Sequence, residues 1–244
     1  MPFNIMENKA ISNDNLIILM ETIDNEINKR SLLHHQFYTL WNEGKLSLDH
    51  LRGYSKEYFQ LVKTVPELVD SIHKNLEKYT PNEYYLKSIK KTYFEELDHI
   101  EPWLKFSLSL GLEKKELLNY KGTKEVNLAI ENLKSLCNSS LIEGVSTMYS
   151  FEKEIPKISK RKIEGLKEFY GINKQEDIKY FKIHEIADIE HANLWKSLIM
   201  NSKINDFKEN YSNELAIKAS VNSLIVQNQI LDSVYNTYVK NTIP

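Results

Sequence analysis

The stretch Tyr180-Phe-Lys-Ile-His184-Glu-Ile-Ala-Asp188-Ile-Glu-His191 combines apolar residues with two histidines and a carboxylate at helical spacing. His184, Asp188 and His191 are at positions i, i+4 and i+7, which lie along one face of an α-helix over two turns. The same face carries Tyr180, Phe181, Ala187, Leu194 and Trp195. Because buried polar groups need partners, a bound metal ion is one way to satisfy all three side chains. Two histidines and one carboxylate form a ligand set that non-haem iron favours.

Histidines and acids at this spacing also occur on ordinary surface helices. The motif alone therefore leaves a solvated helix face open as an interpretation. Its apolar neighbours favour a buried position, and further carboxylates and histidines elsewhere in the chain decide whether a complete metal site exists.

The composition predicts an all-α fold. The chain has 244 residues, 41% of them hydrophobic, and only 7 glycines and 6 prolines, which favours long helices over a loop-rich or all-β fold. We predict a single domain over residues 1–244 with a loose arm at 1–10 and about seven to eight helices in a bundle. The expected helices are about 13–28, 31–43, a long one from Ser47, 81–110, 124–137, 141–155, 157–170, one opening at 173–176, and 206–240, with a polar connection at 112–123.

Three sequence signals set particular helix ends. Pro66 should kink or end the long third helix. Thr80-Pro81-Asn82-Glu83 combines a capping box with proline at the first helical position. Asn173 to Glu176 should open the helix that carries His184.

Charge and cysteine content exclude several classes of protein. Lys and Arg number 32 and Asp and Glu 34, for a net charge of −2, and no long basic block is present, so we expect no nucleic-acid partner. No apolar run reaches the ~18 residues of a membrane helix. The single cysteine, Cys137, cannot form an internal disulfide, and the N-terminus has no signal-peptide pattern. We expect a cytoplasmic protein.

Further candidate ligands lie on two other predicted helices. Glu152 shares a helix face with Val145, Met148, Tyr149 and Ile155. Taken alone, Glu152 could equally be paired with a lysine. Glu95 is four residues before His99, and Glu96 is three residues before it, the Glu-x-x-His spacing of di-iron bundles. Three carboxylates and three histidines from three helices suit two bridged metal ions rather than a closed structural zinc site. Such a centre can activate O₂.

Several blocks of the chain also resemble a known family: 35–54, 95–110, 149–156, 162–171 and 180–191. They are similar, in order, to the haem-oxygenase-like dimetal oxidases, the group that includes the Chlamydia proteins associating with death domains, the pyrroloquinoline-quinone synthesis protein and thiaminase II. The resemblance covers roughly residues 20–200.

The resemblance implies a haem-oxygenase-like bundle without haem that holds two metal ions, Fe/Fe or Fe/Mn, and uses O₂ and a reductant. It implies synthesis of 4-aminobenzoate, the folate precursor, by an enzyme that consumes its own side chains. Tyr38 matches the tyrosine that becomes the ring, Lys162 the amino donor, and Tyr54 and Tyr180 aromatic positions near the metals. The implied metal ligands are Glu95, His99, Glu152, His184, Asp188 and His191.

The residues alone do not lead to these roles. Without the resemblance, Tyr38 is interpreted as a core tyrosine, and Lys162 as one of three solvated basic residues in a row.

Two departures from the family pattern matter. The family has a longer insertion between its first glutamate and the histidine, whereas three residues separate Glu95 from His99. Glu96 therefore remains an alternative ligand, and we choose Glu95. Phe151 occupies a position where the chlamydial relatives have a tyrosine, so a radical relay through this position would be absent.

Other functions remain open. One is a dimetal oxidase that acts on a separate small molecule such as a fatty acid or an amino acid. A thiaminase-II-like hydrolase would need an activated nucleophile, for which Cys137 is the one candidate cysteine. Cys137 can also be interpreted as a small buried apolar residue. An adaptor that binds death-domain proteins would have no need of buried metal ligands. We expect a homodimer, since long apolar helices often pair.

Overall fold

The computed structural model describes residues 13–79, 81–201 and 209–242, and all regular structure in these ranges is helical. This confirms the all-α prediction; the expected arm at 1–10 lies outside the described residues. The helices are α1 Asn13–Lys29, η1 Leu32–His34 (3₁₀), α2 Gln36–Asn42, α3 Leu48–Tyr79, α4 Glu83–Asp98, α5 Ile100–Ser109, α6 Lys114–Asn119, α7 Lys124–Ser139, α8 Leu141–Glu152, α9 Ile155–Glu168, α10 Lys179–Ile199, α11 Glu209–Val234 and η2 Tyr235–Val239 (π).

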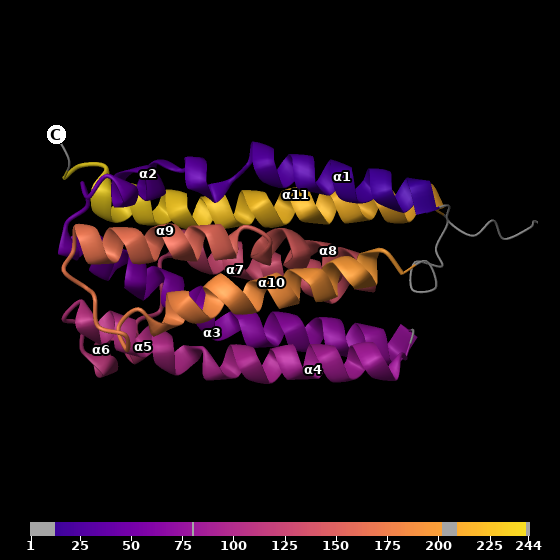
Figure 1. Cartoon of the computed structure of the whole chain (residues 1–244), viewed down its shortest axis with the longest axis horizontal. Coiled ribbons are helices and arrows are strands. Elements are labelled where there is room, and N and C mark those ends of the chain that lie inside the picture. The colour runs from indigo at the N-terminus through magenta and orange to yellow at the C-terminus, as the bar shows by residue number, and fades with distance from the viewer. Residues whose placement is uncertain (1–12, 80, 202–208, 243–244) are drawn as a thin grey trace, which may run out of the picture.

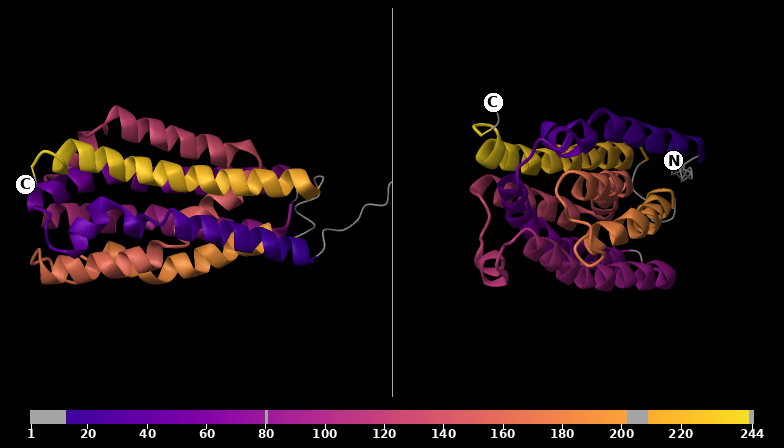
Figure 2. Two further views of the ribbon diagram at one scale, coloured as in Figure 1. Left: turned by 90° about the horizontal axis from the view of Figure 1, so that it is seen from above. Right: turned by 60° about the vertical axis from the view of Figure 1, so that its left-hand side comes forward.

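Most helices run along the long axis of the bundle (Figure 1). Helix α1 lies along α11 on one side, and α4 lies along α3 on the opposite side. Helices α8, α9 and α10 lie between these two layers and pack on one another. Figure 2 shows the elongated arrangement from above and, foreshortened, in a view turned by 60° about the vertical axis. Each central helix therefore has neighbours on several sides.

Two apolar clusters fill the interior. The first is built from α1, the second half of α3, α7, α8, the end of α10 and α11, and contains Trp195. The second is built from α2, the first half of α3, α5, α9, the start of α10 and η2, and contains Trp41 and Trp103. Tyr58 packs against both clusters. Buried polar side chains of α4, α8, α9 and α10 lie where the clusters meet.

The predicted helix 81–110 divides at His99. Helix α4 ends at Asp98 and α5 begins at Ile100. Pro102 explains the break, because it has no N–H for the Asp98 carbonyl and its ring crowds that carbonyl. The break places His99 at the corner between two helices.

Other boundaries also differ from the predictions. Helix α3 continues through Pro66, where buried neighbours such as Leu68 and Val69 offset the cost of about 3 kcal/mol for an internal proline. Helix α10 begins at Lys179 rather than at 173–176, and the short helix α6 occupies the expected polar connection. The division at His99 and the short helices raise the number of described helical segments above the nine expected ranges.

A buried carboxylate, Glu57, ties α3 to the C-terminal π-helix. It accepts hydrogen bonds from the Tyr120 hydroxyl, from the Tyr238 hydroxyl at 3.0 Å, and from the backbone N–H of Thr123 at 3.0 Å. Gly53, one turn earlier on α3, leaves room for the Tyr238 ring, because a Cβ at this position would lie 2.4 Å from it. The last helical turn that the structure describes is thus fixed to the first half of α3.

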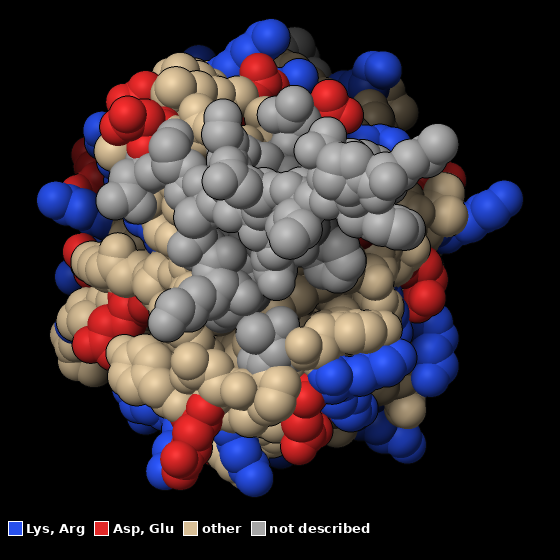
Figure 3. Space-filling model, turned by 90° about the vertical axis from the view of Figure 1, so that its right-hand side faces the viewer, with Lys and Arg blue, Asp and Glu red and all other residues tan. Residues whose placement is uncertain are grey.

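Acidic and basic side chains are interspersed around the end of the bundle shown in Figure 3. Among the described helices, none combines the length and apolar character that spanning a membrane requires.

We predict that Gly53→Ala lowers the free energy of unfolding by about 1–3 kcal/mol, because the new methyl group displaces Tyr238 from Glu57. Helix propensity alone would favour alanine by about 1 kcal/mol, so the sign of the change reports the clash. Urea unfolding measures it, with Lys74→Ala on the exposed side of the same helix as the control. Equal or higher stability of Gly53→Ala would contradict the prediction.

Candidate metal centre

Six potential ligands from three helices and the α4–α5 corner converge in the interior. Each has 6% or less of its surface exposed. Helix α4 supplies Glu96 and its C-terminal corner supplies His99; α8 supplies Glu152 at its last turn; α10 supplies His184, Asp188 and His191. The structure therefore brings together five of the six sequence-predicted ligands, with Glu96 in place of Glu95.

The ligand atoms form two groups that share one carboxylate. Glu96, His99 and His184 make up the first group, and Glu96, Glu152, Asp188 and His191 the second; within each, the ligand atoms lie within 4.8 Å of one another. Glu96 thus lies between the two groups, as a carboxylate that bridges two cations would.

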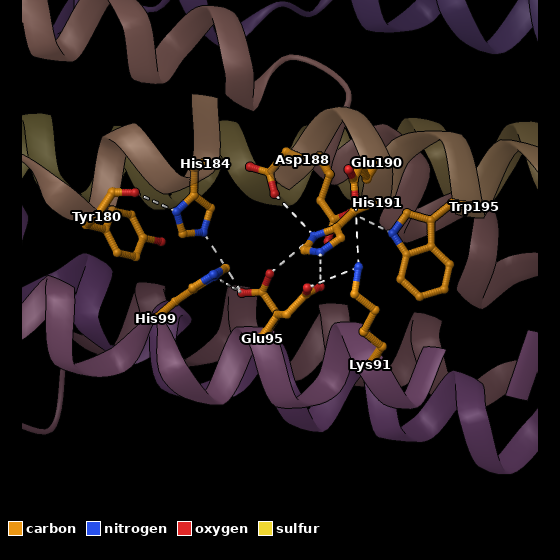
Figure 4. A network of polar contacts seen from close by, with 11 residues as sticks. Lys91, Glu95, His99, Tyr180, His184, Asp188, Glu190, His191 and Trp195 are labelled. Atoms are coloured by element: carbon orange, nitrogen blue, oxygen red, sulfur yellow. Dashed lines mark hydrogen bonds and ion pairs between the residues drawn. The ribbon is translucent and has the colours of Figure 1, made fainter. Parts of the chain in front are cut away.

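Different hydrogen-bond partners set the orientation of each histidine ring. His184 Nδ1 lies 2.8 Å from the Tyr180 carbonyl, which can only accept, so this nitrogen carries the proton (Figure 4). Its Nε2 faces Glu96 Oε2 at 4.0 Å. His191 has the opposite orientation. Its Nε2 lies 3.1 Å from Glu95 Oε2, and its Nδ1 lies 3.4 Å from both Glu96 and Asp188. His99 Nδ1 lies 3.3 Å from Glu96.

Three buried atoms of the second group lack a hydrogen bond of normal geometry: Glu152 Oε1, Asp188 Oδ2 and His191 Nδ1. The other Glu152 oxygen accepts the Trp195 indole N–H at 2.6 Å. Buried atoms without partners cost free energy, and here all three are of metal-ligand type and belong to residues whose ligand atoms lie within 4.8 Å of one another. The residues therefore fit a bound cation.

The pKa shifts of Glu152, Glu96 and His191 also arise because these groups are buried close together. Burial raises the pKa of Glu152 well above its ordinary value, and the charges of Asp188 and Glu96 raise it further. Burial also raises the pKa of Glu96, but the three facing histidines outweigh this and lower it. Burial lowers the pKa of His191, yet its carboxylate neighbours bring it to about 10. The centre holds an excess of negative charge that a metal ion would offset.

Glu95, our sequence-based choice, lies outside both groups. Its side chain is 36% exposed and contacts Lys91 at 3.3 Å as well as His191. Adjacent residues on a helix point about 100° apart, so Glu96, at i and i+3 with His99, faces inward while Glu95 turns toward the surface. We therefore take Glu96 as the candidate ligand.

Lys162 lies in a buried aromatic cluster beside the metal centre. Its Nζ donates a hydrogen bond to the Tyr54 hydroxyl at 2.6 Å and lies 4.7 Å from the centre of the Tyr38 ring. Burial lowers the pKa of Lys162 to about 7, so near neutral pH about half of the amine is uncharged. Burial also raises the pKa values of Tyr38 and Tyr54, which stay protonated.

The buried position of Lys162 could have been found in the sequence. It lies three and four residues from Ile158, Ser159 and Leu166, which share the buried face of α9. The run Lys160-Arg161-Lys162 concealed this, because the first two residues are exposed.

A small cavity of about 20 Å³ joins the metal centre to the amine. Its walls include Glu96, Glu152, His184 and Asp188 from the centre together with Lys162, Tyr58, Tyr180 and Phe151. Tyr180 packs its ring 4.1 Å from that of His184. The volume suffices for about one water-sized molecule. Tyr58 was not singled out in the sequence, although it shares a face with Tyr54.

Cys137 is fully buried in the first apolar cluster. Burial raises the pKa of its thiol, with a smaller contribution from the Glu152 charge. Because the thiolate is the nucleophile in cysteine catalysis, this environment supports the interpretation of Cys137 as a packing residue.

Comparison with known proteins places these features in context. The model of the TENA/THI-4/PQQC family matches residues 25–234. A protein from Chlamydia pneumoniae named 4-aminobenzoate synthase is 30% identical over 181 residues, which cover 74% of this chain and 80% of the relative. One of the same name from Nitrosomonas europaea is 28% identical over 233 residues, 91% of this chain and 93% of the relative.

The fold comparison agrees with the helical bundle. A solved domain of unknown function with a haem-oxygenase-like fold, from Shewanella denitrificans, superposes with a TM-score of 0.72 over 94% of this chain and 96% of that chain, at 18% identity. The expected haem-oxygenase-like fold is confirmed.

We predict that divalent metal raises the thermal midpoint of the purified protein, since a cation offsets the three buried carboxylates. At a manganese concentration of 100 times Kd the gain is about 2.7 kcal/mol, or roughly 5–10 °C for a chain of this size. Scanning calorimetry with and without manganese tests this. Glu96→Ala should show little of the shift, and a full shift in that variant would contradict the assignment of Glu96.

We predict that Lys162 makes stability depend on pH. Its pKa is about 7 when folded and about 10.4 when unfolded, so between these values the unfolded chain binds one more proton. Lys162 therefore contributes a rise of the free energy of unfolding with pH in this window, by up to about 1.4 kcal/mol per unit, while His191, whose pKa is raised to about 10, contributes a change of the opposite sign. In urea unfolding of the metal-free protein at pH 7 to 9, the free energy of unfolding should therefore rise more steeply with pH, or fall less steeply, in wild type and in Lys160→Met than in Lys162→Met. Parallel profiles would contradict it.

Proposed function

The chain belongs to the TENA/THI-4/PQQC family, and from this premise we propose that it makes 4-aminobenzoate by an O₂-dependent reaction at a two-metal centre, with Tyr38 as ring source and Lys162 as amino donor. The names of the curated relatives support the product. The observation that carries the proposal is the position of the Lys162 amine, buried and 4.7 Å from the centre of the Tyr38 ring.

The proposed metal ligands are Glu96, His99, Glu152, His184, Asp188 and His191. Two iron ions, or iron with manganese, bound by these residues would activate O₂ with electrons from a reductant. Glu96 belongs to both groups of ligand atoms, so it could hold either ion. The Tyr180 carbonyl orients His184 and Glu95 orients His191, so the chain supplies a preorganised ligand set.

The residues around Lys162 prepare an amine for reaction. Only the uncharged amine has a lone pair, and burial provides it near neutral pH by lowering the pKa to about 7. The hydrogen bond to Tyr54 fixes the direction of Nζ. The rings of Tyr38, Tyr54, Tyr58 and Phe181 surround the amine, each with its centre within 5.4 Å of Nζ, and exclude water.

The size of the cavity supports consumption of the chain's own side chains. About 20 Å³ holds roughly one water-sized molecule, which is far less than an aromatic acid or a fatty acid needs. A separate substrate of that size would require the chain to open. Lys162 lines the cavity and its amine lies 4.7 Å from the centre of the Tyr38 ring, so no substrate would have to enter.

The cytoplasmic location and the homodimer expected from the sequence belong to this proposal as well. A metal-dependent oxygenase that supplies a folate precursor would work where folate is made. Death-domain binding by an adaptor would leave the buried Glu and His ligands without a role.

Isotope labelling gives the decisive test. Protein produced with ring-labelled tyrosine and ε-¹⁵N-lysine is loaded with iron and manganese without oxygen, and then exposed to O₂ and ascorbate. We expect 4-aminobenzoate that carries both labels, at no more than one molecule per chain, and an intact mass that falls by the lost side-chain atoms. Mass spectrometry of product and protein measures both.

Matched variants identify which residues supply the ring and the amino group. Tyr38→Phe and Lys162→Met should bind metal but give less than a tenth of the product, whereas the exposed controls Tyr79→Phe and Lys160→Met should give the full yield. Full yield from Tyr38→Phe, or unlabelled product formed only from an added compound, would contradict self-consumption.

A further inference from the structure

Glu95 lies beside the metal centre with a hydrogen-bond partner on each oxygen. Its Oε2 is 3.1 Å from His191 Nε2, and its Oε1 is 3.3 Å from Lys91 Nζ. Lys91 also lies 3.6 Å from Glu190 Oε2 on α10 (Figure 4). Glu95 therefore links the exposed edges of α4 and α10 to an imidazole that is only 3% exposed.

The two histidines of α10, His184 and His191, present different ring nitrogens to the centre. His184 is held by the Tyr180 carbonyl one turn earlier in its own helix, so its Nε2 points inward. His191 offers Nδ1 instead, which lies 3.4 Å from both Glu96 and Asp188. No contact with its own helix holds its outer nitrogen; the partner of Nε2 comes from α4.

We propose that Glu95 is a positioning residue that holds His191 with Nδ1 toward the metal. A carboxylate only accepts when ionised, so its contact with Nε2 requires the proton on that nitrogen and leaves the Nδ1 lone pair for a cation. Hydrogen bonds of this kind fix the orientation of metal-bound histidines and increase their basicity. This inference rests on the metal-binding part of the proposed function.

Lys91 and Glu190 have a smaller part in this arrangement. Both side chains are well exposed, at 65% and 73%, and exposed ion pairs contribute little. Loss of Glu190 should therefore leave Glu95 and His191 in place. Glu190 provides a matched acidic control on the same surface.

The experiment distinguishes a positioning residue from a ligand by comparing Glu95→Gln with Glu95→Ala. The glutamine amide oxygen still accepts the Nε2–H of His191, whereas alanine cannot. Manganese(II) is titrated into metal-free wild type, both variants and Glu190→Gln, and free manganese is measured by electron paramagnetic resonance. Thermal melting of the metal-free proteins verifies that each is folded.

We expect Glu95→Ala to weaken manganese binding by about 10–100-fold while the number of ions bound at saturation stays the same. Glu95→Gln should restore most of the affinity, and Glu190→Gln should match wild type. Equal affinity of Glu95→Ala and wild type would overturn this inference alone. Loss of one bound ion in both Glu95 variants would also overturn it, because Glu95 would then be a ligand. Absence of manganese binding by wild type would overturn the metal-binding part of the proposed function as well.

Discussion

Three carboxylates held close together inside an apolar bundle are the constraint on which the site depends. Moving even one such charge from water into a protein interior costs several kcal/mol after relaxation, and Glu96, Glu152 and Asp188 lie within a few ångströms of one another. The histidines and the Trp195 indole satisfy only part of their hydrogen-bonding capacity. The two apolar clusters on either side supply the packing energy that keeps this group buried.

A second buried group, the Lys162 amine, is positively charged when protonated. Burial lowers the pKa of Lys162 to about 7, so part of the amine is uncharged near neutral pH, and the candidate metal centre lies across the same cavity. Cations bound to the carboxylates would place positive charge near this amine and lower its pKa further. Metal loading would therefore increase the fraction of uncharged amine through electrostatics.

The all-α fold and most of the site could be predicted because both depend on local spacing. His184, Asp188 and His191 share a face at i, i+4 and i+7 whatever the rest of the chain does. The choice between Glu95 and Glu96 depended on which way α4 rotates against α10, and tertiary packing decides that. The burial of Lys162 likewise depends on the aromatic residues of α2 and α3 that cover α9. The break at His99 was predictable from Pro102, a local signal that the length of the apolar pattern obscured.

The link between Glu57 and Tyr238 has a consequence for synthesis of the protein. The two residues are 181 positions apart, and α1 packs against α11, so that Asn228 reaches the Arg30 carbonyl from 198 positions away. At roughly 5–20 residues per second, translation leaves the first helices waiting for tens of seconds before their partners emerge. During that interval the apolar face of α1 lacks its contacts with α11, and Glu57 lacks one of its hydrogen bonds. Part of the apolar surface of the nascent chain therefore stays exposed, and open to aggregation, until α11 is made.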